Sequence, residues 1–564
     1  MTRLHLVCTA CGWTPEPPDV DPYPFRCPNA GTDDGDHMVQ PVVSTPGPSA
    51  QQAPLRADTN PFIRYRRSLY SWHVTQAALP RAGLKPRSTI TEQDDISGKY
   101  DSHPDRDYCS IVERIDSAVE RIAGTGFRVT PLFRADGLSQ ALGFGATGGV
   151  WVKDETRNVS GSHKARHLMG VALYLEVLRR SGIDDGNRPL AVASCGNAAL
   201  AAAVVARAIN RALLVFVPEH AGRTVVAQLE RLGAAVTRCS RGSGRRCSTS
   251  SLHPEPAEGR TPESGLRAGD PCYLAFRQAV ADGALPFSCQ GNENGLVIEG
   301  GATIGYEIVD QIRGRATSRH AVTPRTPIPD PDAASGSDDA SNGPSVASVD
   351  RLFVQVGGGA LASACIRALT ESVRSGRLAA LPRIHAVQTS GGYPLKRAYD
   401  RLVDHILERL ESVSRSPESV SRSPRRAFAS DAERAACLLE AAPSGLVDDV
   451  LRYARAHRSA FMWPWETEPL SIATGILDDE TYDWAAVVEG MVRTGGFPVV
   501  VDEATLREAN ELARETTGVD VDHTGSSGLA GLLALSRTGS RPRPDECVVV
   551  LLTGVRREQS DSRR

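Results

Sequence analysis

Lys164 is the residue whose type and position best suit it for chemistry. Residues 158–164 read Asn-Val-Ser-Gly-Ser-His-Lys and lie between an apolar strand and an apolar helix. An amine at a helix N-terminus lies beside a partial positive charge, which disfavours protonation and helps to present a neutral nucleophile. A lysine in a first helical turn is more often a solvated surface residue. The interpretation therefore depends on what other segments supply.

Three more strand ends carry groups that can hold a ligand. Residues 193–198 read Ala-Ser-Cys-Gly-Asn-Ala, so their amides and the Ser194 hydroxyl suit the carboxylate of an amino acid. Gly357–Gly359 lie between a strand and a helix, where bare backbone can close around a phosphate. Thr553 places a hydroxyl at the carboxyl end of a strand, where ligands of open α/β folds bind.

The elements that must position these groups alternate along the chain from Val129 onward. Short apolar strands followed by Ala-rich helical stretches are typical of parallel α/β architecture. The expected strands are 149–153, 190–193, 213–217, 352–356, 384–388, 499–501 and 548–552, and the expected helices include 164–180 and 197–209.

Taken in order, these motifs resemble the fold type II pyridoxal-phosphate enzymes, the tryptophan synthase beta-like superfamily, which includes threonine synthase, threonine dehydratase and cysteine synthase. The resemblance spans about 130 to 555. It implies an α/β body of two subdomains, with twisted parallel sheets flanked by helices. It also implies pyridoxal 5'-phosphate as cofactor, a small amino acid as substrate, and a homodimer.

The same resemblance implies a role for each motif. Lys164 would form the Schiff base with the cofactor and serve as the catalytic base. Asn197 would meet the cofactor 3'-oxygen, and Thr553 would face the pyridine nitrogen. The substrate would be held by Ser162, Ser194 and Gly196, and the cofactor phosphate by Gly357, Gly358, Gly359, Ala360 and Leu361.

A hydroxyl such as that of Thr553 leaves the pyridine nitrogen largely unprotonated, which favours elimination and replacement reactions. Among enzymes of this kind the chain is most similar to threonine synthase, which converts O-phosphohomoserine to threonine and phosphate. The similarity includes the segments 60–65, 130–135 and 522–531. The last of these is equally well explained as a helix packed by small residues.

Several residues depart from the threonine synthase pattern. His163 and Ala165 flank the lysine where Phe and Asp are usual, and Val297 and Ala302 stand where that enzyme has basic residues. A phosphorylated substrate needs cationic partners. Substitutes would have to come from Lys153, Arg157, Arg166 or Lys396, each of which we expect at the surface.

Two alternatives therefore stay open. A threonine or serine ammonia-lyase on the same scaffold would explain the missing basic residues. A non-catalytic sensor that binds the cofactor is a remoter alternative, against which the intact Lys164 argues. The aromatic segment 461–469 could line the substrate pocket or pack in the core.

The first 45 residues form a separate, zinc-ribbon-like module. Cys8, Cys11 and Cys27 have ribbon spacing, but the usual fourth cysteine is absent and His37 is the nearest replacement. A metal-free knuckle is the alternative. We expect an N-terminal arm at 46–128, a catalytic body at 129–555, and insertions too polar to pack at 240–270, 314–350 and 411–426.

Composition excludes some partners. The chain has 564 residues, 41% of them hydrophobic, and a formal net charge of -3, so no strong field favours nucleic acid or an anionic membrane. No basic patch interleaved with aromatics lies near the module. Most cysteines are scattered singly, and no apolar run reaches the ~20 residues that span a bilayer. We expect a cytoplasmic enzyme without nucleic-acid or membrane partners.

Overall fold

The computed structural model describes most of the chain. The described residues are 4–43, 58–78, 103–184, 186–219, 221–240, 270–319, 348–414, 428–441 and 445–557. The three expected insertions fall mostly outside them. At their margins the chain is more regular than expected, because α9 (Val297–Arg319) continues through Gly314 and α11 (Pro394–Ser414) continues through Glu411.

The larger sheet has six strands in the order β11-β10-β9-β12-β4-β3. Neighbouring strands are parallel except at the edge, where β3 runs antiparallel to β4. The strands read as nearly continuous apolar runs because helices cover both faces of such a sheet. Their bounds are β3 (Leu132–Arg134), β4 (Gly149–Asp154), β9 (Arg351–Gln355), β10 (Arg383–Thr389), β11 (Val499–Val501) and β12 (Cys547–Leu552).

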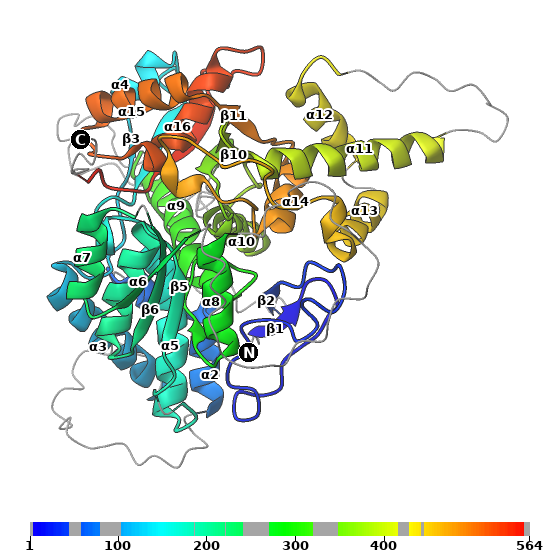
Figure 1. Ribbon diagram of the computed structural model, residues 1–564. Coiled ribbons are helices and arrows are strands. Elements are labelled where there is room, and N and C mark those ends of the chain that lie inside the picture. Colours follow the sequence, from blue (N-terminus) through cyan, green and yellow to red (C-terminus); the bar gives the residue numbers. More distant parts are fainter. Residues whose placement is uncertain are drawn as a thin grey trace, which may run out of the picture.

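The smaller sheet has four parallel strands in the order β7-β6-β5-β8. In Figure 1 it forms the lower lobe with its flanking helices, and the six-stranded sheet lies above it. The strands are β5 (Leu190–Ala193), β6 (Leu213–Pro218), β7 (Ala235–Cys239) and β8 (Leu285–Pro286), and the helices of this lobe include α6 (Asn197–Ala208), α7 (Arg223–Arg231) and α8 (Pro271–Ala281).

Two long helices connect the lobes. Helix α5 (Lys164–Arg180) is buried over almost its whole length and packs against α9, which in turn packs against α10 (Ala360–Arg374). Gly170 and Gly300 allow the close approach of α5 and α9, because a Cβ on Gly300 would lie 2.0 Å from the Arg166 carbonyl oxygen. The start of α5, which carries Lys164, is therefore fixed at the junction of the lobes.

The remaining helices cover the larger sheet or extend from it. Helix α16 (His523–Ser536) lies on the sheet through small residues, with Gly528 against Phe353 and Gly531 against Val387. The others are α4 (Asp136–Ala141), α12 (Asp431–Ala441), α13 (Gly445–Ala456), α14 (Trp484–Thr494) and α15 (Glu503–Thr517). Among the described helices, none combines the length and the apolar content that crossing a membrane requires.

The expected α/β class is confirmed. Every expected strand is present, with ends shifted by at most one residue, and α5 and α6 occupy the expected ranges to within one residue. Helix α3 (His103–Ala123), inside the expected arm, was not predicted. Ile111, Ile115 and Val119 recur on one face of that helix and are fully buried, which is the amphipathic pattern that was overlooked.

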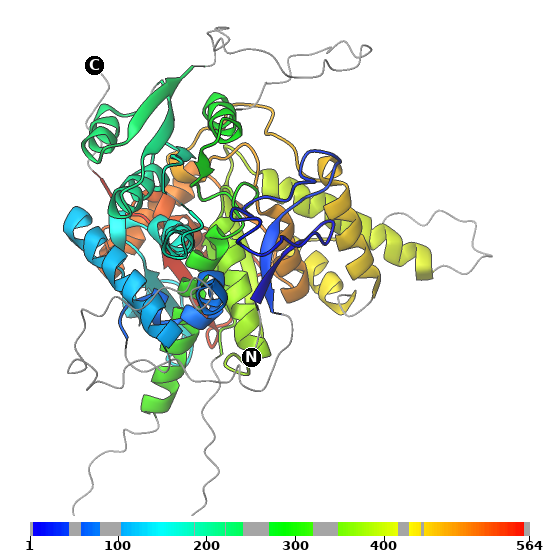
Figure 2. The ribbon, with the colours of Figure 1, turned by 90° about the horizontal axis from the view of Figure 1, so that it is seen from below.

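The N-terminal module is a two-stranded antiparallel sheet, β1 (Leu4–Cys8) with β2 (Val39–Val43). It contacts both lobes, since Tyr23 donates to Asp184 and the Asp36 amide donates to the Arg455 carbonyl at 2.7 Å. Figure 2 shows the blue module beside the gold helix α13. The arm then adds α1 (Pro61–Arg64) and α2 (Tyr70–Ala78), with Phe62 buried edge-on against Phe127.

Candidate functional site

Lys164 is the first residue of α5, after a tight left-handed turn. Ser160 and Gly161 have φ of 58° and 66°, and a Cβ on Gly161 would lie 2.3 Å from Val555. The Val555 amide donates to the Gly161 carbonyl at 2.8 Å, which ties this turn to the segment after β12. A β-bridge between Ser162 and Gly554 does the same, so the predicted turn brings the start of α5 beside the segment that follows Thr553.

Lys164 differs from the other described lysines in having no partner. Lys153 is fully buried and ion-paired with Glu307, and Lys396 is paired with Asp400. The Lys164 side chain makes no hydrogen bond or ion pair with any part of the chain that the structure describes, and it is only partly buried. A free amine at a buried junction is suited to covalent bonding with a carbonyl compound.

Thr553 is oriented by Gln355. The Gln355 Nε2 donates to Thr553 Oγ1 at 2.6 Å and to the Gly525 carbonyl at 2.9 Å. Because the Thr553 oxygen accepts this bond, its own proton is left to donate elsewhere. Thr553 is therefore prepared to donate to an acceptor such as a ring nitrogen. Sequence reasoning missed Gln355, although its place just before the glycines was visible.

His163 adds an unexpected buried imidazole next to the lysine. Burial and then the charge of Lys164 lower the pKa of His163 well below its ordinary value. Its Nδ1 has no hydrogen-bond partner among the described residues. The ring lies edge-on to His167, whose Nδ1 is bonded to the Val297 carbonyl. His163 is thus a neutral group at the floor of the site.

The glycine turn lies between β9 and α10 as expected, and a second segment packs on it. A Cβ on Gly357 would lie 2.3 Å from Asp478 Oδ2, and one on Gly358 would lie 2.9 Å from Tyr482. Gly359 has φ of 97°, which favours glycine. The absence of side chains at 357–359 is therefore needed for close approach by residues 476–483 as well as for any phosphate.

Asp478 and Asp483 bring acidic groups to this junction. Burial raises the pKa of Asp478 to about 6 and that of Asp483 to about 8, although Lys164 lowers both. Asp483 is 1% exposed, and its carboxyl lies against the main chain at Gly291, whose amide lowers the pKa less than burial raises it. Sequence reasoning missed both, because an acidic run at 478–480 is usually a solvated surface.

The Ser194–Asn197 turn closes the site from the smaller sheet. Ser194 follows β5, and its hydroxyl accepts from the Gly196 amide at 3.3 Å. Asn197 begins α6, and Arg557 donates to its Oδ1 and to the Ser160 carbonyl. Burial lowers the pKa of Arg557 and the charge of Asp522 raises it; since no described carboxylate forms an ion pair with Arg557, this wall carries a partly balanced cation. It too was missed, since it lies beyond the last expected strand.

Three other predicted residues face inward to the fold. The Ser162 hydroxyl is fully buried and accepts from the Lys164 amide at 3.4 Å. Ala360 and Leu361 have buried side chains, so they present only the first amides of α10 to the site.

The four substitute cations that we considered are not free to hold a phosphorylated substrate. Lys153 and Arg166 are fully buried, contrary to the expected surface position, and are paired with Glu155 and Glu307. Arg157 is 79% exposed beside Asp154, and Lys396 is held by Asp400 and Asp431. Val297 and Ala302 are buried in the start of α9.

The aromatic segment divides between two roles. Phe461 and Met462 pack in the core of the larger lobe. Trp463 lies under the Arg397 guanidinium, 3.8 Å from the ring centroid, and Trp465 packs on Tyr393. The core-packing interpretation therefore applies to the first half of the segment.

The N-terminal module brings its four predicted ligands together. The ligand atoms of Cys8, Cys11, Cys27 and His37 all lie within 4.8 Å of one another. Tetrahedral zinc with four sulfur ligands separates them by about 3.8 Å. His37 is also bonded to Asp33 at 2.8 Å, an outer carboxylate of the kind that orients metal-bound histidines. The cluster is a candidate metal site.

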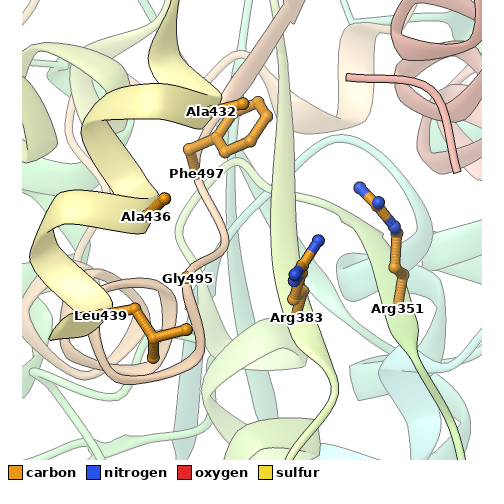
Figure 3. Close-up of a pocket in the computed structure, with 7 residues that line it drawn as sticks. All are labelled: Arg351, Arg383, Ala432, Ala436, Leu439, Gly495 and Phe497. Atoms are coloured by element: carbon orange, nitrogen blue, oxygen red, sulfur yellow. The ribbon is translucent and has the colours of Figure 1, made fainter. Parts of the chain in front are cut away.

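A separate pocket lies at the amino-terminal ends of the strands of the larger sheet. It is lined by Arg351 and Arg383, the first residues of β9 and β10, and by α12 and the segment before β11 (Figure 3). Parallel strands place Thr553 and the glycines at their other ends. This pocket is therefore not part of the site around Lys164.

Comparison with known proteins supports a cofactor-dependent enzyme. Residues 124–325 match the family described as pyridoxal-phosphate dependent enzyme, a range that contains Lys164 and Asn197. A 118-residue stretch is 35% identical to the mouse protein named serine dehydratase-like, covering 21% of this chain and 32% of the relative. The rat protein of that name is 34% identical over 109 residues, covering 19% and 30%. The chain thus spans about a third of the length of the curated relatives that it matches.

Solved structures give weaker likenesses. Maize serine racemase is 15% identical and matches 80% of this chain and 94% of its own, with a TM-score of 0.45. Threonine deaminase isoform 2 from Solanum lycopersicum is 14% identical and matches 82% and 92%, also with a TM-score of 0.45. Likenesses at this level carry no information on substrate. The family match supports pyridoxal 5'-phosphate as the cofactor.

Proposed function

We propose that this protein is a pyridoxal-phosphate-dependent lyase that eliminates a group from a small amino acid and releases ammonia and a keto acid. The observation that carries the proposal is the unpartnered Lys164 beside Thr553, whose hydroxyl proton is free to donate. The serine dehydratase-like relatives support the reaction class.

The residues around Lys164 fit the cofactor. The Lys164 amine would hold its carbonyl carbon, Thr553 would donate to its ring nitrogen, and amides at 357–361 would hold its phosphate. Asp478 touches this turn, so it must be protonated or turned aside when the phosphate is present, and burial already raises its pKa to about 6. When bound, the cofactor withdraws electrons from the α-carbon of the substrate.

The chain's own groups would carry the proton and orient the substrate. Lys164 would remove the α-proton as general base. Arg557, Asn197 and Ser194 would bind the substrate carboxylate, because Arg557 supplies a cation without an ion pair to a described carboxylate. Burial lowers the pKa of His163, so this neutral side chain would add no positive charge next to the cofactor ring.

A threonine synthase acting on O-phosphohomoserine is the second candidate. The buried arm residue Phe62 and the ordered Asn60 cap agree with the motif that favoured this reading. Against it, the expected basic positions are Val297 and Ala302, and the four substitute cations are otherwise engaged. We therefore rank the ammonia-lyase first.

Product analysis separates the two candidates. Purified enzyme would be given serine, threonine and O-phosphohomoserine at equal concentration, and ammonia, keto acid and phosphate would be measured. We expect ammonia and keto acid from the hydroxyl substrates to exceed phosphate release. The reverse ranking, with threonine formed, would assign the enzyme to the threonine synthases.

We also propose that Cys8, Cys11, Cys27 and His37 bind zinc. The four ligand atoms lie within 4.8 Å of one another, and Asp33 bonds to the His37 ring at 2.8 Å as the outer carboxylate of a metal-bound histidine does. Anaerobically purified protein should contain one zinc per chain, and Cys11→Ser should lose it. Protein without stoichiometric zinc would identify a metal-free knuckle.

A further inference from the structure

The pocket shown in Figure 3 has two walls of different chemistry. One wall is formed by the strands and carries two guanidinium groups, those of Arg351 and Arg383. The other is apolar, and its residues are Ala432, Ala436 and Leu439 of α12 with Gly495 and Phe497. None of the described residues that line the pocket is acidic. Its volume of about 80 Å³ leaves room for about six non-hydrogen atoms.

The strand register places the two arginines side by side. Strands β9 and β10 run parallel, each begins with one of these arginines, and Arg383 is the partner of Arg351 across the pair. Like charges opposite each other on neighbouring strands repel. The Glu546 carboxylate offsets one of the two charges, because its oxygens accept from the Arg351 guanidinium at 2.5 and 3.3 Å.

Arg383 is the cation that remains. It is exposed, and its side chain forms no hydrogen bond or ion pair with any residue that the structure describes. Burial, and then the charges of Arg351 and Arg383, lower the pKa of the buried His385 ring to about 3. An unpaired cation next to a second cation favours an anion in the pocket between them and α12.

The apolar wall offers contact area to a hydrocarbon chain. Leu439 is 40% exposed and packs on Gly495, where an added Cβ would lie 3.1 Å from the Leu439 Cδ2. Gly495 ends α14 with φ of 67°, a conformation that favours glycine, so no side chain fills the pocket at this position. A short apolar chain against Leu439 and Phe497 is removed from water, whereas an inorganic anion gains nothing from this wall.

We infer that this pocket binds a monocarboxylate with a short apolar chain. The carboxylate accepts hydrogen bonds from the Arg383 guanidinium, whose planar set of donors matches two carboxylate oxygens, and the chain lies against Leu439 and Phe497. An ammonium group would meet two cations and no acidic lining residue, so the pocket disfavours amino acids. This site is separate from Lys164, and its assignment does not depend on the reaction proposed there.

Three probes separate the contribution of the charge from that of the chain. Butanoate has both, butanamide has the chain without the charge, and inorganic phosphate is an anion without a chain. Binding of each to the holoenzyme would be measured by titration calorimetry at low ionic strength. We expect butanoate to bind at least about tenfold more tightly than butanamide, the effect of hydrogen bonds to a charged group, and more tightly than phosphate.

Two variants locate the bound probe. Arg383→Gln removes the cation and should reduce the preference for butanoate over butanamide to within about twofold. Leu439→Asn keeps the side-chain size but removes apolar contact, so it should weaken butanoate at least about threefold and leave its preference over butanamide. Arg207→Gln, at an exposed arginine of α6 in the smaller lobe, is the matched control and should behave as wild type. Both altered pocket residues are exposed, and either variant alone locates the probe if the other folds poorly.

Several results would overturn the inference. Tighter binding of phosphate than of butanoate would identify a site for inorganic anions. Butanoate binding that is unchanged in both variants would place the probe elsewhere in the protein, and equal binding of butanamide would show that Arg383 does not recognise the charge. Absence of butanoate binding to the wild type would leave the pocket without this ligand. Each of these results leaves the cofactor assignment at Lys164 intact.

Discussion

Two groups of charged residues, one around Arg166 and one around Lys164, meet at the start of helix α5. They differ in whether their charged atoms are paired with atoms of opposite charge. In the first, which we call the Arg166 cluster, Lys153, Glu155, Arg166 and Glu307 are fully buried, and all are joined by hydrogen bonds. In the second, the Asp483 group, Lys164 makes no ion pair with a described residue, and no cation is bonded to the Asp478 and Asp483 carboxyls, which lie against the main chain at Gly358 and Gly291. The first arrangement is complete without a ligand, and the second is not.

The presence or absence of cationic partners explains why the carboxyl pKa is lowered in the first group and raised in the second. Burial alone would raise the pKa of Glu307, but Arg166 and Lys153 outweigh it and hold the pKa below its ordinary value. Burial dominates at Asp483, whose pKa is raised to about 8. A saturated cluster stabilises a fold, whereas an unsaturated one of the same depth marks a binding site. Sequence position alone did not distinguish them.

The largest expected effect is at Lys164. Lys164→Ala removes the amine that we assign to the cofactor, so activity should fall at least about 10³-fold while the fold is retained. Borohydride reduction followed by mass spectrometry should show covalent cofactor in the wild type and none in the variant. Lys396→Ala, which alters a lysine held by Asp400, is the matched control and should behave as wild type. Covalent cofactor in Lys164→Ala would show that a residue other than Lys164 bonds the cofactor.

The second effect is on stability rather than activity. Arg166→Met leaves Glu155 and Glu307 buried without a full set of partners, which should lower the free energy of unfolding by about 3–5 kcal/mol. Arg157→Met, at a side chain 79% exposed, should change it by less than about 0.5 kcal/mol. Urea unfolding followed by circular dichroism measures both. A small effect at Arg166 would mean that its cluster does not hold the fold.

The sequence predicted the parts of the site that the backbone fixes. Lys164, Gly357 and Thr553 follow β4, β9 and β12, which are neighbours in one parallel sheet. The apolar runs of these strands are visible in the sequence. The α/β class followed from the same alternation. These features depend on local pattern, so they could be read before the structure.

The parts that depend on packing between distant segments could not be predicted. Arg166 and Lys153 looked like surface cations because their partner Glu307 lies more than a hundred positions away in the chain. Asp483 was not singled out, because nothing local shows that residues 476–483 fold onto the glycine turn. In each case, burial was decided by a contact that has no local sequence signal.

The smallest effect concerns how the free energy of unfolding changes with pH, because the sign of this change should differ between the two groups. The folded-state pKa of Asp483 is about 8, above its ordinary value of 3.8, so between these values the folded protein holds a proton that the unfolded chain releases. The contribution of Asp483 to stability is therefore full at low pH and is lost as pH rises toward 8. Asp483→Asn stays neutral throughout. It should match the wild type near pH 4 and be the more stable protein near pH 8, where the wild-type carboxyl has lost its buried proton.

Glu307→Gln should behave in the opposite way. Its folded-state pKa is lowered by Arg166 and Lys153 after burial is overcome, so the wild-type carboxylate stabilises the fold above its ordinary pKa, and the variant should be less stable at neutral pH. Urea midpoints of the cofactor-free proteins from pH 4 to 8 would compare the two variants directly. If Asp483→Asn shifted the midpoint equally at every pH, Asp483 would not hold a proton in the folded state. The contrast between the saturated and the unsaturated group would then have to rest on ligand binding alone.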